Sequence, residues 1–265
     1  MKRAVLPVLL VVCVLPLAAC GGGSGGGSSS QGANLTPVAY VKSAATKSAK
    51  ATSEHMELTG AVTVAGQAVT LKGSGDFDNE NHQGQLHADV NLGGMAASID
   101  AVLDGTTIYL KSPILSAALP QGKTWIKIDY EKVGKSKGVD FSQLLAQDPS
   151  QAFKQLQASG KVVPVGDETI DGVDTTHYRA TLDTKKLAPG LTAAHAGSYN
   201  VWIGKDDGYI YRVRSTFAAG DTAGKRLAQT TTLNFSDFGK DVTVDVPSDA
   251  ESYDATKSGI QGLGG

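Results

Sequence analysis

The feature that most constrains the fold is a change in hydrophobic period near residue 56. Before it, Thr36-Pro37 offers a capping hydroxyl followed by proline, and apolar residues then recur at helical spacing to about Ser53. From Met56 to Val64, apolar and polar residues alternate instead. Alternation places apolar side chains on one face of a strand and polar side chains on the other. Such a chain is expected to form an antiparallel sheet with one wet face.

The same alternation continues along most of the chain. Strands are expected at 56–64, 69–77, 86–92, 95–103, 108–110, 125–130, 162–165, 175–182, 199–203, 209–217, 227–235 and 242–246, and further helices at 141–159 and 185–195. Gly93-Gly94 and Asp104-Gly105 are typical two-residue hairpin turns. A helix, two runs of strands and a helical excursion between them predict an α+β fold.

Four glycines interrupt the first strands, at Gly60, Gly73, Gly75 and Gly84. Glycine weakens a flat sheet but suits a bulge or a sharp bend. We therefore expect a strongly curved antiparallel sheet of about 11–12 strands, with its concave face against a few helices.

The N-terminus predicts export and a lipid anchor. Met1-Lys2-Arg3 is positively charged, and residues 4–19 are almost wholly apolar but too short for a membrane span, so 1–19 are interpreted as a signal peptide. Residues 17–21 read Leu-Ala-Ala-Cys-Gly, which resembles the bacterial lipobox, and this resemblance implies a lipid on the sulfur of Cys20. The alternative is an ordinary secretory signal with an incidental cysteine. With the anchor, the protein is expected on the outer face of the cytoplasmic membrane.

The rest of the chain is divided by composition. Residues 20–34 hold the lipidated cysteine and a Gly/Ser-rich tether without side chains able to form a core. Residues 35–247 contain no linker long enough to divide them and are expected to be one domain. Residues 248–265, rich in glycine near the end, are expected to be a flexible tail.

Composition argues against several classes of function. The net charge of −2 provides no basic excess for nucleic acid. Of the two cysteines, Cys13 would leave with the signal peptide and Cys20 would carry lipid, so a thiol enzyme is not expected. No nucleophile, triad or cofactor motif is present, so we expect neither catalysis nor a cofactor.

A metal site is not expected either. The histidines, including His82 and His87, lack metal-ligand spacing. Asp76, Asp78 and Glu80 imitate the start of a calcium loop, but the sixth position is not glycine and the twelfth is not acidic. This segment is interpreted as a solvated hairpin tip.

Three segments carry a resemblance to a known family. Residues 202–213 read Trp-Ile-Gly-Lys-Asp-Asp-Gly-Tyr-Ile-Tyr-Arg-Val and resemble the strand–turn–strand hairpin of LolA-like lipoprotein carriers. Residues 172–178, Gly-Val-Asp-Thr-Thr-His-Tyr, and the hairpin-like segment 235–244 resemble more closely the LppX/LprAFG type of actinobacterial lipoprotein. The order of elements agrees from Pro37 to Pro247.

The resemblance implies a half-open barrel around helices, enclosing a hydrophobic cavity. It also implies a monomer that binds lipid or acylated glycolipid and carries it within the envelope, with an envelope transporter as a partner. The candidate cavity-lining residues are the apolar members of the alternation: Leu58, Val62, Leu71, Phe77, Leu86, Val90, Met95, Ile99, Leu103 and Ile108. The same residues can also pack densely. In that case the protein would be a non-carrier lipoprotein acting as an adaptor or a sensor.

Three lysines form a basic segment after residue 130. Lys132, Lys135 and Lys137 stand among Gly and Ser, in what is expected to be a loop between the sheet and the next helix. Most such runs are only solvated. The alternative places these lysines at the cavity mouth, where they would contact anionic lipid headgroups.

Overall fold

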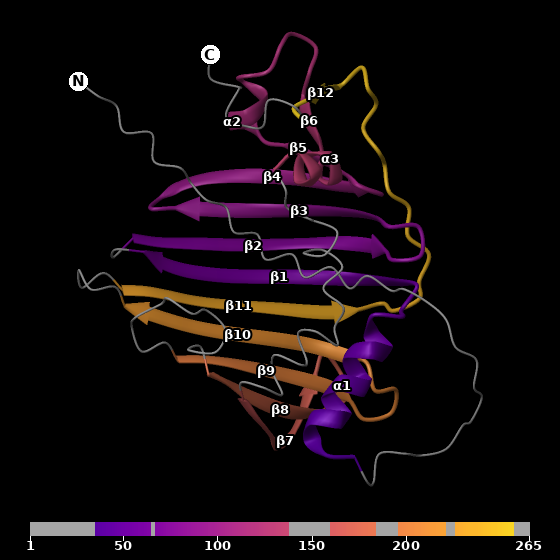
Figure 1. Cartoon of the computed structure of the whole chain (residues 1–265), viewed down its shortest axis with the longest axis vertical. Helices are drawn as coiled ribbons and strands as arrows, with labels where there is room; N and C mark the ends of the chain where they lie inside the picture. The colour runs from indigo at the N-terminus through magenta and orange to yellow at the C-terminus, as the bar shows by residue number, and fades with distance from the viewer. Residues whose placement is uncertain (1–34, 65–66, 138–159, 184–195, 221–225, 257–265) are drawn as a thin grey trace.

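Over its described residues, the protein forms a single open sheet of twelve strands with few helices (Figure 1). The computed structural model describes residues 35–64, 67–137, 160–183, 196–220 and 226–256. The elements are α1 (Pro37–Ser48), β1 (Ser53–Val64), β2 (Gln67–Asp78), β3 (Gln83–Leu92), β4 (Met95–Asp104), β5 (Thr107–Lys111), α2 (Pro113–Ser116), β6 (Trp125–Asp129), α3 (Tyr130–Lys137), β7 (Gly160–Ile170), β8 (Val173–Asp183), β9 (Ala196–Gly204), β10 (Ile210–Gly220), β11 (Arg226–Ser236) and β12 (Ser252–Asp254). This arrangement confirms the sheet-dominated part of the prediction.

Two meanders make up the sheet and meet at its centre. The order is β12-β6-β5-β4-β3-β2-β1-β11-β10-β9-β8-β7, so β1 to β6 run outward and β7 to β11 run back (Figure 1). β1 pairs with β11 over its length, from His55 opposite Ser236 to Val64 opposite Leu227. All neighbours are antiparallel except β12, which is parallel to β6. The edges, β12 and β7, are not paired with one another, so the sheet is not closed.

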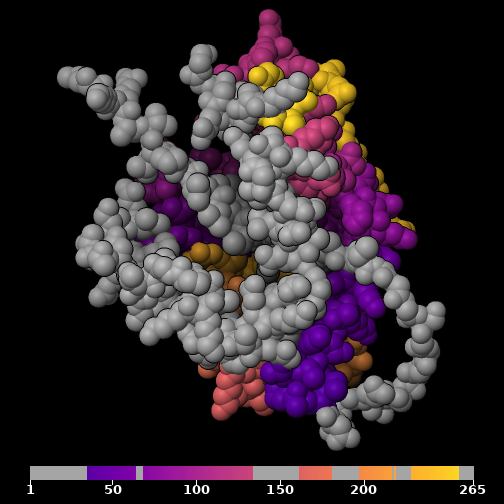
Figure 2. Space-filling view, viewed as in Figure 1, coloured from indigo at the N-terminus to yellow at the C-terminus, as the bar shows by residue number. Residues whose placement is uncertain are grey.

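Helix α1 begins where the sequence predicts. The Thr36 hydroxyl accepts a hydrogen bond from the amide of Ala39, and Pro37 follows at the first helical position. The helix ends at Ser48, earlier than expected, because Ser53 already belongs to β1. α1 contacts β7, β9 and β10, and lies against β7 at the lower end of the space-filling view (Figure 2).

The expected strand at 242–246 is wrong. This segment has no strand structure, because β1 and β10 already occupy both edges of β11 and leave the chain no edge on which to return. After β11 the chain instead runs past the ends of β1 to β5 and reaches the far edge of the sheet at β12 (Figure 1).

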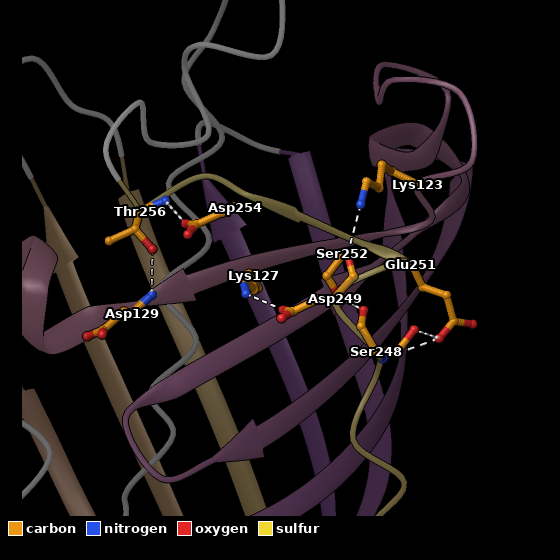
Figure 3. A network of polar contacts seen from close by, with 9 residues as sticks. All are labelled: Lys123, Lys127, Asp129, Ser248, Asp249, Glu251, Ser252, Asp254 and Thr256. Carbon is orange, nitrogen blue, oxygen red and sulfur yellow. Dashed lines mark hydrogen bonds and ion pairs between the residues drawn. The ribbon is translucent and has the colours of Figure 1, made fainter.

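The expected flexible tail also needs correction for residues 248–256. β12 pairs with β6, and Ala255 after it is fully buried. Lys127 forms an ion pair with the Asp249 carboxylate, and Lys123 donates a hydrogen bond to the Asp249 carbonyl (Figure 3). The sheet therefore continues to about residue 256, while 257–265 lie outside the described residues.

Several other predictions fall outside the described residues. These are the signal peptide at 1–19, the tether and Cys20 at 20–34, and the helices at 141–159 and 185–195. The basic segment after residue 130 is described as far as 137, and it is a helix, α3, rather than a loop. Asp129 caps it, because its Oδ1 accepts a hydrogen bond from the amide of Lys132 at 3.0 Å.

Candidate functional site

All ten candidate cavity residues lie on one face of the sheet. Residues directly opposite in neighbouring antiparallel strands share a face, and the register places Val62 opposite Val69, two residues from Leu71. The registers of β2 with β3, β3 with β4 and β4 with β5 place the remaining candidate residues on the same face. We call it the apolar face; it carries Leu58, Val62, Leu71, Phe77, Leu86, Val90, Met95, Ile99, Leu103 and Ile108.

The apolar face is packed under α1 and again at β6, where Ile126 is fully buried, and its candidate residues between these two regions are mostly half-buried. Under α1, the buried residues Val41, Ala44 and Ala45 join a core cluster with residues of β1 and β7 to β11. Of the ten residues, Leu58 belongs to this core, and Leu71, Phe77 and Leu86 pack against its edge. The other six lie farther from α1: Val62, Val90, Ile99, Leu103 and Ile108 are half-buried, and Met95 is 71% exposed.

Glycines let β2 and β3 approach closely within this face. A Cβ atom at Gly73 would lie 2.7 Å from the carbonyl oxygen of His87, and one at Gly75 would overlap the carbonyl oxygen of Gln85. Only glycine fits there, because the neighbouring backbone leans towards the apolar face. The Phe77 ring lies over Gly84 in the same region, so that a Cβ at this position would overlap Cδ1 of the ring. The close approach of the two strands accounts for glycine at these positions.

The three lysines predicted to meet headgroups all lie on α3. The ammonium of Lys132 is 2.8 Å from Oδ2 of Asp129, and this contact raises the pKa of Lys132. Lys135 and Lys137 lie on the last turn, and their side chains are outside the described part of the chain. The structure therefore places the three residues on one short helix after β6, with one of them already paired to a carboxylate.

Two of the three family-like segments, 172–178 and 202–213, build a polar network on the opposite face. His177 lies with its ring stacked on Trp202, 4.2 Å between centroids. Its Nδ1 is 2.9 Å from Oε1 of Glu168, and the indole of Trp202 donates to Oε2 of the same carboxylate at 2.9 Å. These hydrogen bonds lower the pKa of Glu168. The motif residues thus hold β7, β8 and β9 together.

Sequence reasoning missed Glu54, which is 5% exposed at the start of β1. It lies opposite Phe77 and so belongs to the apolar face. Its Oε2 is buried without a hydrogen-bond partner among the described residues, and burial raises the pKa of the carboxyl to about 7. The alternation of Met56 and Leu58, continued two residues towards the N-terminus, places Glu54 on the same face and would have identified it.

The described residues contain no group of three or more His, Cys, Asp or Glu side chains arranged to hold a metal ion. In the calcium-loop-like segment, Asp78 instead accepts hydrogen bonds from the backbone and side chain of Asn81, at 2.9 and 2.8 Å. Within the described ranges, no helix has the length and apolar character to cross a membrane.

Several known proteins are similar to this chain. An uncharacterized 31.2 kDa protein from the rplA-rplJ intergenic region of Streptomyces griseus is 27% identical over 251 residues, covering 83% of this chain and 79% of that protein. The lipoprotein LppX of Mycobacterium tuberculosis aligns with a TM-score of 0.47 and 19% identity, over 79% of this chain and 98% of LppX. A chain of the Pseudomonas aeruginosa MucA/MucB complex aligns with a TM-score of 0.35 and 14% identity, over 76% and 58%.

A family model decides the assignment. The model of the LppX_LprAFG lipoprotein family matches residues 36–244, which span α1, every strand from β1 to β11 and all three segments that carry the resemblance. This match confirms the resemblance found in the sequence, and the family is one of lipoproteins rather than of enzymes. The chain belongs to the LppX_LprAFG lipoprotein family.

Proposed function

We propose that the protein binds a lipid or an acylated glycolipid on its apolar face and carries it within the cell envelope. The observation that supports this most strongly is the row of half-buried apolar side chains on β3 to β5, including Val90, Ile99 and Ile108. Leaving apolar area half-exposed forgoes about 25 cal/mol for each Å² that a packed core would bury. A bound acyl chain would recover this free energy.

The proposed site lies beside the packed core rather than inside it. α1 packs against β7, β9 and β10, and we expect the close approach of β2 and β3 at Gly73 and Gly75 to bend the sheet towards the same side. A concave apolar surface next to a fixed helix can hold an extended chain without first opening a core. We therefore place the acyl chains over β2 to β5, within the half-open barrel.

The proposal includes attachment to a membrane. Cys20 follows a signal-like segment and precedes a Gly/Ser tether, and membership of a lipoprotein family supports lipidation at its sulfur. Two or three acyl chains hold a protein on a membrane stably, whereas one chain gives only marginal binding. We place the protein on the outer face of the cytoplasmic membrane, where it would receive its ligand and pass it to an envelope transporter.

The experiment is mass spectrometry of lipid recovered with the mature lipoprotein from a native-like host, after exchange into a detergent that removes loosely bound lipid. Ile99→Asn should lower the lipid recovered several-fold, because it places an amide on the proposed acyl surface. Ser98→Asn is the matched control, since it changes the neighbouring residue on the other face of β4. Repeated recovery of no lipid with the wild-type chain would favour a packed, non-carrier adaptor or sensor instead.

A second experiment tests the headgroup role of α3. Reversing charge at Lys132, Lys135 and Lys137 together should weaken binding to anionic liposomes by at least about tenfold at low salt, given roughly 1 kcal/mol per lysine near such a surface. The control reverses Lys42, Lys50 and Lys72, three exposed lysines elsewhere, and so has the same net charge. Equal binding by the two variants would remove α3 from the proposal.

A further inference from the structure

A run of apolar residues lies exposed between β5 and β6. Every residue from Pro113 to Pro120 is apolar except Ser116, and Ile114 is 72% exposed. The chain from α2 to β6 stands out at the top of the molecule in Figure 1, and it forms the magenta projection at the top of Figure 2. We call residues 113–120 the apolar segment. Single exposed apolar residues are ordinary, whereas a group of them marks an interaction surface.

The apolar segment lies next to the start of β4. Lys111 of β5 pairs with Asp100 of β4, and the chain then continues into α2, which contacts β4. Because β5 is antiparallel to β4, this continuation leads towards Met95, the first residue of β4. Met95 lies on the apolar face and is 71% exposed. The two most exposed large apolar side chains among the described residues, Ile114 and Met95, therefore occur at the same end of the sheet.

The backbone of the apolar segment forms its own hydrogen bonds. The hydroxyl of Ser112 accepts from the amide of Leu115 at 3.2 Å, and the amides of residues 116–119 donate to carbonyls of residues 112–116. Pro113 and Pro120 have no amide to satisfy. Placing an unpartnered amide in an apolar medium is costly. The segment can therefore enter a lipid interface with few unpaired backbone donors.

Two lysines flank the apolar segment. Lys111 precedes it, and Lys123 follows it and donates a hydrogen bond to the backbone carbonyl of Asp249. Within the described ranges neither lysine forms an ion pair: the Asp249 carboxylate pairs with Lys127, and Glu251 attracts Lys111 only at longer range. Lysines beside an apolar run suit a membrane interface, where their ammonium groups stay at the headgroups while the run meets the acyl chains.

We propose that the apolar segment inserts into the interface of a lipid bilayer, and that lipid enters and leaves the protein at this end of the apolar face. This inference rests on the proposed lipid binding and adds the place where the ligand crosses. Ile114 would lie at the boundary between headgroups and acyl chains. Met95 would continue the apolar surface from there to the candidate residues on β3 and β4. Lipid suits a projecting segment that has few unpaired backbone donors to offer a protein partner.

The predicted anchor restricts the orientation of the inserted protein. The tether joins α1, which packs against β7 at one edge of the sheet, whereas the apolar segment follows β5 near the other edge. Nine strand spacings separate β5 from β7, which is about 43 Å in a flat sheet. The tether of residues 20–34 reaches about 20 Å on average. Insertion therefore requires the sheet to lie inclined to the membrane rather than upright on it.

The test reads the depth of residue 114, because the anchor would hold the protein on a membrane in any orientation. The mature lipoprotein with Ile114→Cys is labelled with an environment-sensitive fluorophore and reconstituted in vesicles of phosphatidylcholine and phosphatidylglycerol. Its emission should shift to the blue and be quenched by lipids brominated on their acyl chains. Quenching should persist at about 1 M salt, where screening confines charge contacts to roughly 3 Å.

Val165→Cys is the matched control. Val165 is an aliphatic residue with 47% exposure on β7, at the other edge of the sheet, so its label should keep the emission of an aqueous site. Wild-type protein carried through the labelling checks that Cys20 takes up no fluorophore, as expected of a lipidated sulfur.

A second measurement tests the passage of lipid. Ile114→Asp places a charge on the inserted segment and should slow the uptake of a fluorescent phospholipid from donor vesicles several-fold. The lipid that it holds at equilibrium should match the wild type, because residue 114 lies outside the acyl surface on β2 to β5. Val165→Asp should take up lipid at the wild-type rate.

The proposal is overturned if the label at residue 114 is not quenched, or is quenched no more than the label at residue 165. Self-quenching that grows with protein density would overturn it as well, because a second copy would then cover the segment. So would wild-type uptake by Ile114→Asp, since lipid would enter elsewhere. Lipid recovered from a wild type whose apolar segment stays in water leaves the proposed function standing. Quenching at residue 114 with no lipid recovered keeps the membrane contact and removes the lipid binding.

Discussion

Glu54 lies in phase with Met56 and Leu58, yet it places a carboxyl where those residues place hydrocarbon. Its environment stabilises the protonated form, as the raised pKa shows. A folded state that holds a proton more tightly than the unfolded state loses stability as pH rises between the two pKa values. The contribution of Glu54 to stability is therefore more favourable in mild acid than at pH 8. Carboxylates whose pKa is lowered in the folded state, such as Glu168, have the opposite effect.

The resulting prediction concerns the difference between wild type and Glu54→Gln. Between about pH 4.5 and about pH 7 the wild type should lose about 3 kcal/mol of unfolding free energy relative to the variant, and the gap should stay constant above that range. Urea denaturation at a series of pH values measures it. Glu57→Gln should follow the wild-type curve. Parallel curves for wild type and Glu54→Gln would contradict the prediction.

At the residue scale, the sequence predicts well which face of the sheet a side chain lies on. It predicts poorly which other side chains that residue contacts. The ten apolar candidates lie on one face because parity along a strand is a local property, readable from alternation. The stacking of His177 on Trp202 and the shared hydrogen bonds of Glu168 depend on strand register, which no single stretch of sequence specifies. Cys20 stays a prediction, since it lies outside the described residues.

At the scale of elements, β2 and β3 depend on glycine for their close approach. Gly75→Ala would direct a methyl group into the carbonyl of Gln85, so we expect a loss of about 1–3 kcal/mol in unfolding free energy. Gly60→Ala is the control on the same face, because its Cβ would lie 3.5 Å from the Cβ of Leu71, an ordinary contact. Thermal or urea unfolding compares the two. Similar stability in both variants would show that the strands can separate at no cost.

The elements that were predicted wrongly from the sequence share a cause. Whether each of these segments forms a strand or a helix depends on contacts with neighbouring elements. Residues 242–246 alternate like a strand but find no free edge. β12 has only three residues, too few for a periodic signal, and exists because β6 offers an edge. α3 contains Gly134 and Ser136, poor helix formers, and depends on the cap from Asp129.

At the scale of the whole molecule, the C-terminal segment 248–256 covers β6, the outer strand of the first meander, by pairing β12 with it. Deleting residues 248–265 removes β12 and the buried Ala255, and uncovers the edge of β6. We expect a loss of at least about 2 kcal/mol in unfolding free energy, from lost hydrogen bonds and burial. Deleting only 257–265 should leave the stability unchanged. If both truncated chains unfold at the same urea concentration, β12 contributes nothing to the fold.

The pairing of β1 with β11 also governs how this protein is made. A ribosome completes β1 to β6 long before it reaches β11, so the nascent first meander exposes a twelve-residue edge with unpaired amide and carbonyl groups. Such an edge is a template for pairing with another chain. The central seam, joining the two ends of the chain, also has a high contact order, which slows folding. The nascent chain must therefore avoid association with other copies of the protein until β11 has been synthesised and can pair with β1.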